Sequence, residues 1–254
     1  MNRQNGVEAL LETYPRHRPP LPPAHQRIYV EHYRANRAGE RGLSYLARRL
    51  ESWMHRKVAD GVQGSVLEIG AGNLNHLPYH SAAGAYDVVE PFRELWAGSP
   101  HLSRVRRIYS GIEEVPDHER YDAIVSTAVL EHLTDLPHVV ARAALLLRLD
   151  GTFRAGFPSE GGLLWGLAWR LTTGLEFRIR RRLHYAAIMR HEHVNTAREI
   201  LSVLEHFFES VTVSRFPLPS ENLSFYTVAA ARGPRIARCL DICASRLRLG
   251  TCAP

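Results

Sequence analysis

The sequence predicts an α/β fold with a doubly wound, mostly parallel seven-stranded sheet that ends in an antiparallel hairpin. Across residues 65–155, short apolar segments alternate with loops and helical segments at the spacing of strand–helix–strand units, which favours a parallel sheet. Closer to the C-terminus, two β-rich segments are joined by a short linker at 217–222, and a connection this short favours antiparallel strands.

The composition is that of a globular protein. Of 254 residues, 45% are hydrophobic and 23% are charged, and 32 Lys and Arg against 26 Asp and Glu give a net charge of +6. This balance excludes a disordered chain and a coiled coil. The single lysine, Lys57, follows no glycine-rich loop, which excludes a P-loop. The positive charge is diffuse, so we expect no nucleic-acid partner.

No segment predicts a membrane span or a secretory leader. The longest apolar run, 163–169, is far shorter than the about 20 residues that a span requires. Glu8 and Glu12 stand where the apolar part of a leader would lie. We therefore expect a cytoplasmic protein.

Residues 1–59 are expected to form an N-terminal arm and a helical cap. Prolines make 15–23 unsuitable for a helix or an inner strand, so an extended arm is expected there. From 28 to 59 apolar residues recur at steps of three and four, which predicts a helix that Gly61 and Gly64 end.

The core of the fold is expected over residues 60–233. One helix is predicted at 135–149 from its amphipathic pattern. A later helix begins with Asn195 or Thr196 as its N-cap, and Glu199 is placed to form a capping box with Thr196. The expected strands comprise 65–69, 86–90, 105–109, 121–126, 151–155, 210–216 and 223–231.

Two segments depart from this alternation. Residues 160–195 form an insert with an apolar piece at 163–171 and a basic run at 178–182. Residues 234–254 form a tail that we expect to be loosely attached. All three cysteines lie in this tail, outside the candidate core, which predicts neither a disulfide framework nor a zinc site.

A glycine bend follows the first strand and an acid ends the second. Gly70 and Gly72 allow a tight turn and let a ligand lie against backbone N–H groups. Glu90 stands where a carboxylate can accept both hydroxyl protons of a bound ribose. Asn75 occupies the position of a third glycine, which disfavours a nicotinamide cofactor. The structural alternative is that the glycines only turn the chain and that Glu90 is an acid at a helix N-terminus.

Glu68 narrows the cofactor class. An acid two residues before the first glycine would repel a pyrophosphate and is placed to hold a cationic ammonium, directly or through water. A loop that disfavours anions, beside an acid that binds ribose, indicates S-adenosylmethionine, which carries a sulfonium, an ammonium and a single carboxylate.

Four motifs follow one another in order. They are Glu-Ile-Gly-Ala-Gly-Asn at 68–73, Glu90, Ser-Gly-Ile-Glu-Glu-Val-Pro at 110–116, and the segment 121–133 that ends in Leu-Glu-His-Leu. Together they resemble the motifs of class I S-adenosylmethionine-dependent methyltransferases, nearest to the small-molecule branch that includes the ubiquinone and menaquinone biosynthesis enzymes. The resemblance covers about 60–231 and implies a Rossmann-like sheet, since the terminal antiparallel hairpin is also that family's ending.

The resemblance also implies roles for individual residues. Those assigned to the methionine end of the cofactor are Glu68, Gly70, Ala71, Gly72 and Asn73. Those assigned to the ribose and the adenine are Glu90, Pro91, Phe92, Ile112 and Glu113, and those beneath the sulfonium are Ser126 and Thr127. Two positions differ from the family pattern: Leu74 stands where a third glycine is common, and Gly111 where an aspartate is common.

His132 and His193 are the candidate catalytic residues. A hydroxyl acceptor needs a base to remove its proton, whereas a neutral amine does not. His132 follows the fourth strand, at the expected mouth of the site. His193 has a structural alternative, packing before the helix cap, and a metal alternative with His191. No third ligand is evident, so no metal is predicted. The other candidates for the base are His184, Tyr185, His191 and Glu192.

The insert 160–195 is expected to form a lid over a small-molecule acceptor. The basic run 178–182 suits a phosphate or carboxylate on that acceptor, or is simply a solvated helix face. The segment 163–182 also resembles an interfacial anchor, although we do not favour a membrane contact. In the family the N-terminal segment often folds over the cofactor, so Tyr33 and Arg37 are secondary candidates.

The leading hypothesis is a methyltransferase that acts on an oxygen or nitrogen of a small metabolite, with anionic and sugar-linked intermediates among the options. Three alternatives stay open: a non-catalytic scaffold that binds S-adenosylmethionine, a peripheral-membrane lipid or quinone methyltransferase, and a nicotinamide-dependent oxidoreductase. The sequence identifies neither the acceptor nor the oligomeric state.

Overall fold

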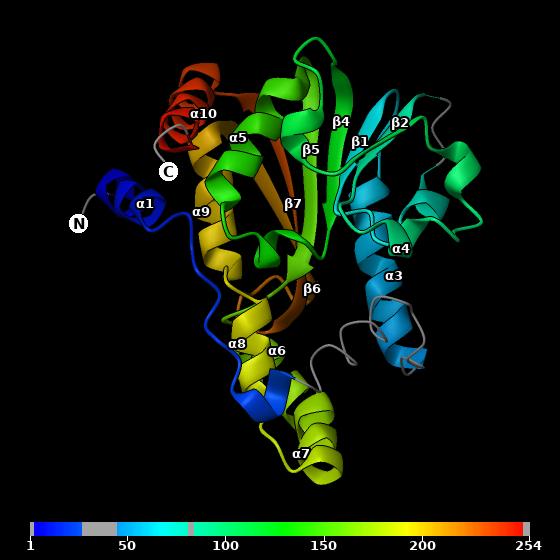
Figure 1. Ribbon diagram of the computed structural model, residues 1–254, viewed down its shortest axis with the longest axis vertical. Helices are drawn as coiled ribbons and strands as arrows, with labels where there is room; N and C mark the ends of the chain where they lie inside the picture. The colour runs from blue at the N-terminus through cyan, green and yellow to red at the C-terminus, as the bar shows by residue number, and fades with distance from the viewer. Residues whose placement is uncertain (1–2, 27–44, 81–83, 251–254) are drawn as a thin grey trace.

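A computed structural model describes residues 3–26, 45–80 and 84–250, and its centre is a seven-stranded sheet (Figure 1). The strand order is β3-β2-β1-β4-β5-β7-β6. The first five strands pair in parallel, and β7 runs antiparallel to both β5 and β6. The strands are β1 Val66–Ile69, β2 Tyr86–Val89, β3 Arg107–Tyr109, β4 Tyr121–Thr127, β5 Leu147–Pro158, β6 Phe208–Pro217 and β7 Ser224–Pro234. The predicted fold class is therefore confirmed.

Helices cover both faces of the sheet. The main core lies between the sheet and α5 and α9, and a second core lies between the sheet and α3. Because β1 and β2 are buried on both faces, they are almost continuously apolar, as inner parallel strands are. The longer helices are α1 Arg3–Glu12, α3 Tyr45–Ala59, α5 Leu136–Leu146, α9 Ala197–Phe207 and α10 Ile236–Gly250. The short helix α4 Arg93–Trp96 follows β2.

The junction between α5 and β5 differs from the prediction. The helix was expected to continue to residue 149, but α5 ends at Leu146 and β5 begins at the next residue. The prediction counted Leu149 as part of the buried face of the helix, but Leu149 is 88% exposed. The fifth strand therefore begins four residues earlier than the predicted 151 and extends to Pro158.

The predicted start of α9 is confirmed. Thr196 is the N-cap: its Oγ1 accepts a hydrogen bond from the Glu199 backbone N–H, and Glu199 Oε2 accepts one from the Thr196 N–H. This reciprocal capping box satisfies two backbone donors that a helix start leaves without intrahelical partners. It also fixes the point at which the insert rejoins the core.

The tail after Gly233 is not loosely attached, and this expectation was wrong. It forms α10, which packs beside α5 and α9 (Figure 1). Cys239 is fully buried in the main core, which also corrects the placement of all cysteines outside it. Arg246 Nε lies 2.8 Å from Asp135 Oδ2 at the start of α5. The apolar residues of α10 are separated by arginines in the sequence, and for this reason the helical pattern was not recognised.

The insert forms three short helices at one end of the molecule, and α7 lies farthest from the sheet (Figure 1). They are α6 Leu163–Trp169, α7 Leu175–Arg181 and α8 Ala186–Glu192, with a wider π-helical turn at Arg170–Gly174. Within the described ranges, no helix combines the length and the apolar character needed to cross a bilayer. Of the helix predicted at 28–59, residues 27–44 lie outside the described part of the chain.

Candidate active site

A cavity of about 930 Å³ lies at the carboxyl edge of the parallel strands. Its walls are the loops that follow β1, β2, β3 and β4, together with residues of α8 and the segment after it. In doubly wound sheets, ligands bind in the crevice outside these strand ends. The cavity is therefore the candidate active site.

The loop after β1 adopts the bend that its glycines predict. Gly70 has φ +72° and Gly72 has φ +51°, a left-handed conformation that glycine adopts without strain. A Cβ on Gly70 would lie 2.3 Å from Val129 Cγ2, so the loop after β4 leaves no room for a side chain. Leu74 also has a positive φ, +66°, and is fully buried. The position where the family often has glycine thus keeps the same backbone conformation.

Glu90 is held at the cavity by the backbone on two sides. Its Oε2 accepts a hydrogen bond from the Gly72 N–H at 2.8 Å, and its Oε1 accepts one from the Phe92 N–H at 3.1 Å. The side chain lines the cavity and is only 6% exposed. Each carboxylate oxygen can accept a further hydrogen bond. The arrangement suits a ligand with two neighbouring hydroxyl groups.

Glu68 lies beneath the cavity and does not line it. The side chain is 2% exposed, and the Tyr86 hydroxyl donates a hydrogen bond to its Oε2 at 2.8 Å. Burial, with a smaller contribution from the charge of Glu90, raises the pKa of Glu68 to about 8, against the opposing effect of the Tyr86 hydrogen bond. Glu68 and Glu90 are thus neighbours, but only Glu90 faces the cavity.

Of the two predicted residues at the end of β4, one lines the cavity and the other does not. The Ser126 hydroxyl is buried and donates a hydrogen bond to the Ile69 carbonyl at 3.2 Å, so it lies outside the lining. Thr127 lines the cavity, and its Oγ1 is buried without a hydrogen-bond partner among the described residues. The sequence-predicted residues that do line the cavity are Gly70, Ala71, Gly72, Asn73, Glu90, Pro91, Phe92, Ile112, Glu113, Thr127, His132 and His193.

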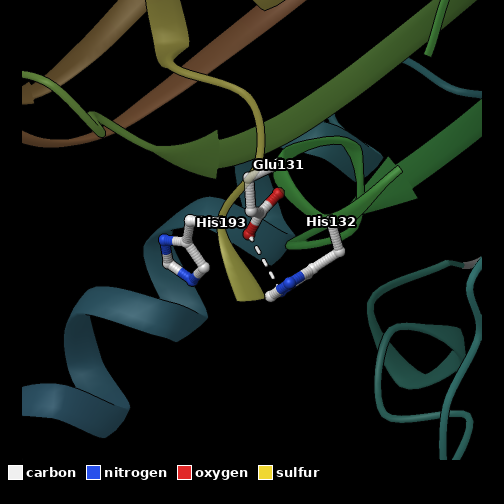
Figure 2. Close-up of side chains that lie close together, drawn as sticks. All are labelled: Glu131, His132 and His193. Carbon is white, nitrogen blue, oxygen red and sulfur yellow. Dashed lines mark ion pairs between the residues drawn. The ribbon is translucent and has the colours of Figure 1, made fainter. Parts of the chain in front are cut away.

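His132 and His193 lie together in one wall of the cavity, and Figure 2 shows Glu131 beside them. Their ring centroids are 4.9 Å apart in an edge-on arrangement. His132 Nδ1 lies 2.9 Å from the Glu192 carbonyl oxygen, and His193 Nδ1 lies 2.8 Å from Glu160 Oε2. Burial opposes the charged form of His132, but the hydrogen bond to Glu192 and the nearby carboxylates raise its pKa overall.

The N-terminal arm fixes this wall, which the sequence did not indicate. Arg18 donates hydrogen bonds to the carbonyl oxygens of His132 at 2.9 Å and His191 at 3.1 Å. Arg16 pairs with Glu199 at 2.7 Å, in the first turn of α9. These contacts join residues more than a hundred positions apart, and no local pattern could have revealed them.

The remaining candidates from the sequence divide between the cavity and the surface. Tyr185 and Glu192 line the cavity, whereas His184 and His191 do not. His191 Nδ1 instead lies 2.7 Å from the Pro19 carbonyl oxygen. Tyr33 and Arg37 fall in the segment 27–44, outside the described residues.

Three solved structures with a similar fold are methyltransferases of different kinds. The N-methyltransferase NodS from Bradyrhizobium japonicum WM9, in complex with S-adenosyl-L-homocysteine, is 15% identical, with a TM-score of 0.51 over 92% of this chain and 100% of that one. An O-methyltransferase family protein from Burkholderia thailandensis is 14% identical, with a TM-score of 0.53 over 92% and 71%. The plantazolicin methyltransferase BpumL, in complex with a monoazolic desmethylPZN analog and S-adenosyl-L-homocysteine, is 11% identical, with a TM-score of 0.56 over 91% and 99%.

At these identities the structures show the fold alone, and a comparison with curated proteins finds no match. The family is identified from the sequence. A model described as a methyltransferase domain matches residues 31–207, which is more than half of the chain and includes the glycine bend, Glu90, His132 and His193. The chain therefore belongs to the methyltransferase domain family.

Proposed function

We propose that this methyltransferase takes its methyl group from S-adenosylmethionine and transfers it to an oxygen or nitrogen of a small metabolite. The observation that carries the proposal is the Glu90 carboxylate, held by two backbone N–H groups beside the bend at Gly70 and Gly72. Two neighbouring hydroxyls of a ribose are the natural partners of this carboxylate. The complexes of NodS and BpumL with S-adenosyl-L-homocysteine support the same donor.

In this proposal the donor lies along the strand ends. Its methionine end rests on Gly70–Asn73, its adenine lies between Pro91 and Ile112, and its sulfonium lies near Thr127. Glu68 acts from beneath the loop. Its raised pKa means that Glu68 is protonated more readily than an ordinary glutamate. The positive charge of a bound donor would lower this pKa again and favour the carboxylate form of Glu68.

Methyl transfer requires mainly that the acceptor be held in the correct orientation to the donor. A lone pair of the acceptor attacks the methyl carbon, the C–S bond breaks, and a neutral thioether leaves with the bonding electrons. Holding the acceptor in line behind that bond and excluding water supplies most of what the reaction needs. We place the acceptor between the donor and the wall of His132 and His193, beneath a lid formed by 160–195. The core would then be 60–233, with 1–59 as the cap and 234–254 as a C-terminal addition.

Calorimetry with S-adenosylmethionine tests the proposal. Wild-type protein is expected to bind, and Glu90→Ala to bind at least about tenfold more weakly, because two charge-assisted hydrogen bonds are lost. Glu94→Ala is the matched control, since Glu94 is an exposed acid on the next turn. Absence of heat with wild-type protein would refute the proposal. Binding without methyl transfer to any extract fraction would favour the scaffold, and binding of NADH by fluorescence would favour an oxidoreductase.

A second candidate function is favoured by an apolar row on the lid. Five large aliphatic side chains recur every fourth residue along α6, the π-turn and α7, and all are exposed. They are Leu163, Leu167, Leu171, Leu175 and Ile179. Residues spaced by four form a ridge along one side of a helix. Arg170, Arg178, Arg181 and Arg182 are also exposed on these helices. An apolar row flanked by arginines suits the surface of an anionic bilayer, from which a lipid acceptor would reach the site.

Sedimentation with vesicles tests this second candidate. Wild-type protein is expected to sediment with vesicles that contain phosphatidylserine and not with pure phosphatidylcholine. Leu171→Glu should abolish sedimentation, because a charge then interrupts the row. Leu149→Glu is the control, since Leu149 is an exposed leucine at the α5–β5 junction. Equal behaviour of the two variants, or no sedimentation of wild-type protein, would contradict a membrane contact.

A further inference from the structure

We propose that Glu131, His132 and His193 bind a divalent transition-metal ion at the acceptor end of the cavity, and that the acceptor is a hydroxyl compound bound to this ion through oxygen. The metal site stands on its own geometry. The role of the ion in catalysis rests on the methyltransferase function proposed above. Sequence reasoning found only His191 and His193 and therefore predicted no metal.

The three side chains converge on one point. Each offers one ligand atom, and these atoms all lie within 4.8 Å of one another. Figure 2 shows both rings and the carboxylate turned toward a common space, with His132 Nε2 3.8 Å from Glu131 Oε1. Ligand atoms at about 2.0–2.2 Å from an ion lie roughly 3–4 Å apart, so small side-chain rotations complete the site.

Hydrogen bonds fix the tautomer that a metal requires. His193 Nδ1 faces Glu160 Oε2 at 2.8 Å, and a carboxylate oxygen accepts, so Nδ1 donates its N–H. His132 Nδ1 faces the Glu192 carbonyl oxygen at 2.9 Å, which also only accepts. In a neutral ring the lone pair then lies on Nε2. Metal-binding histidines typically donate their other N–H to a carboxylate or a backbone carbonyl in this way.

Glu131 supplies the negative charge. Its side chain is 1% exposed, and its Oε2 has no hydrogen-bond partner within the described part of the chain. Leaving a buried carboxylate oxygen without a partner is costly, and such groups call for an explanation in the structure. A cation between Glu131 and the two imidazole rings provides one.

The two loops that carry the ligands are fixed to each other. The backbone N–H groups of Val194 and Asn195 donate to the Glu131 carbonyl oxygen at 2.9 and 3.1 Å. Asn195 Nδ2 donates to the carbonyl oxygens of Leu130 at 2.8 Å and Leu133 at 2.7 Å. Residues more than 60 positions apart are therefore held in register without a ligand, which is the preorganisation a metal site needs.

The donor set indicates both the ion and its use. Two imidazole nitrogens and one carboxylate suit Zn²⁺, Mn²⁺, Fe²⁺ or Co²⁺ better than Mg²⁺ or Ca²⁺, which prefer oxygen ligands. His132 and His193 line the cavity, so the remaining coordination positions face the acceptor. A coordinated hydroxyl releases its proton to solvent more readily, and the resulting oxyanion attacks the methyl carbon as the C–S bond breaks. An amine gains nothing from this, so the site selects oxygen acceptors.

Titration of metal-free protein with Co²⁺ tests the metal site. Wild-type protein should bind one ion per chain and develop the visible absorption of Co²⁺ in a site of low symmetry. Glu131→Gln and His193→Ala should each weaken binding at least about tenfold, since each removes one ligand. His118→Ala is the control, because His118 is exposed and lies outside the cavity. Failure of wild-type protein to bind Co²⁺, or variants that bind as well as wild type, would overturn the proposal.

Three further measurements complete the test. Thermal unfolding and S-adenosylmethionine calorimetry on the same metal-free proteins separate a folding defect and a failure of the proposed function from a failure of the metal site. His193→Gln replaces either variant that does not fold. Acetohydroxamate, a chelator with two oxygen donors, should shift the Co²⁺ absorption if coordination positions are open to an acceptor. An unchanged spectrum would contradict coordination of a hydroxyl acceptor.

Discussion

Side chains on neighbouring positions of β1 face opposite sides of the sheet, and this decides which acid meets the ligand. Ile69 lines the cavity, so Glu68 faces away from it, toward Tyr86. The sequence placed Glu68 at the ligand because it stands two residues from the glycine bend, without using the period of two. Glu90 follows the end of β2, and its carboxylate reaches the loop after β1.

The buried Glu68 predicts a pH dependence of stability. Its pKa is raised from 4.5 to about 8, so the folded state holds the proton more tightly than the unfolded state does. The stabilising contribution is complete below about pH 4.5 and is lost as the pH rises toward about 8. Wild-type protein should therefore lose more stability across this range than Glu68→Gln, by an amount on the order of a few kcal/mol.

Urea denaturation of both proteins at a series of pH values measures this difference. Parallel stability curves for the wild type and Glu68→Gln would show that Glu68 ionises normally and is better solvated than its buried position implies.

The cavity wall formed by His132 and His193 depends on the connection between the loop after β4 and the segment before α9. Asn195 is 1% exposed, and its side chain makes four hydrogen bonds, one of them accepted from Arg16 at 3.3 Å. It accepts one from the Tyr14 hydroxyl at 2.7 Å and donates two to the carbonyl oxygens of Leu130 and Leu133. A single amide thus joins the N-terminal arm and the loop after β4 to the end of the insert.

Asn195→Ala should lower the free energy of unfolding by about 2–4 kcal/mol, because it leaves two carbonyls and a hydroxyl without their partners in a buried site. Methyl transfer should fall with it, since His132 and His193 lose their relative placement. Asn222→Ala, at an exposed asparagine, should change stability by less than about 0.5 kcal/mol. Two variants of equal stability would show that the connection is not structural.

Elements were predictable where a local signal existed. The capping box at Thr196 and Glu199 and the bend at Gly70 were each encoded within a few residues, and both are present. The end of α5 was not, because whether Leu149 is buried depends on residues distant in the sequence. The short helices of the insert follow the same rule, since many of their apolar residues are exposed and two buried ones, Phe177 and Ile188, pack against Leu21, which is distant in the sequence.

Within the described residues, two cores lie on either side of one sheet, α10 completes the larger of them, and a smaller apolar cluster joins the insert to the N-terminal arm. The mostly parallel sheet followed from the alternation of segments along the sequence, and the final hairpin from the short linker at 217–222, whereas the order of the strands comes from the structure. The convergence of Glu131, His132 and His193, and the contacts of Arg18, did not, because the fold alone brings these residues together.

Cys239 tests whether α10 is part of the core. Cys239→Ser should destabilise the protein by about 1–3 kcal/mol, since a hydroxyl is then buried in an apolar site. Leu240→Ser on the same helix should have little effect, because Leu240 is exposed. The comparison is made by urea denaturation. Equal stabilities would indicate that α10 separates from the sheet in solution.

The most direct test of the central claim is a crystal structure of the protein with S-adenosyl-L-homocysteine. We predict that both ribose hydroxyls donate to Glu90 at about 2.6–2.9 Å and that the thioether sulfur faces His132 and His193. A ligand whose ribose does not contact Glu90, or a cavity that stays empty at saturating ligand, would contradict the account.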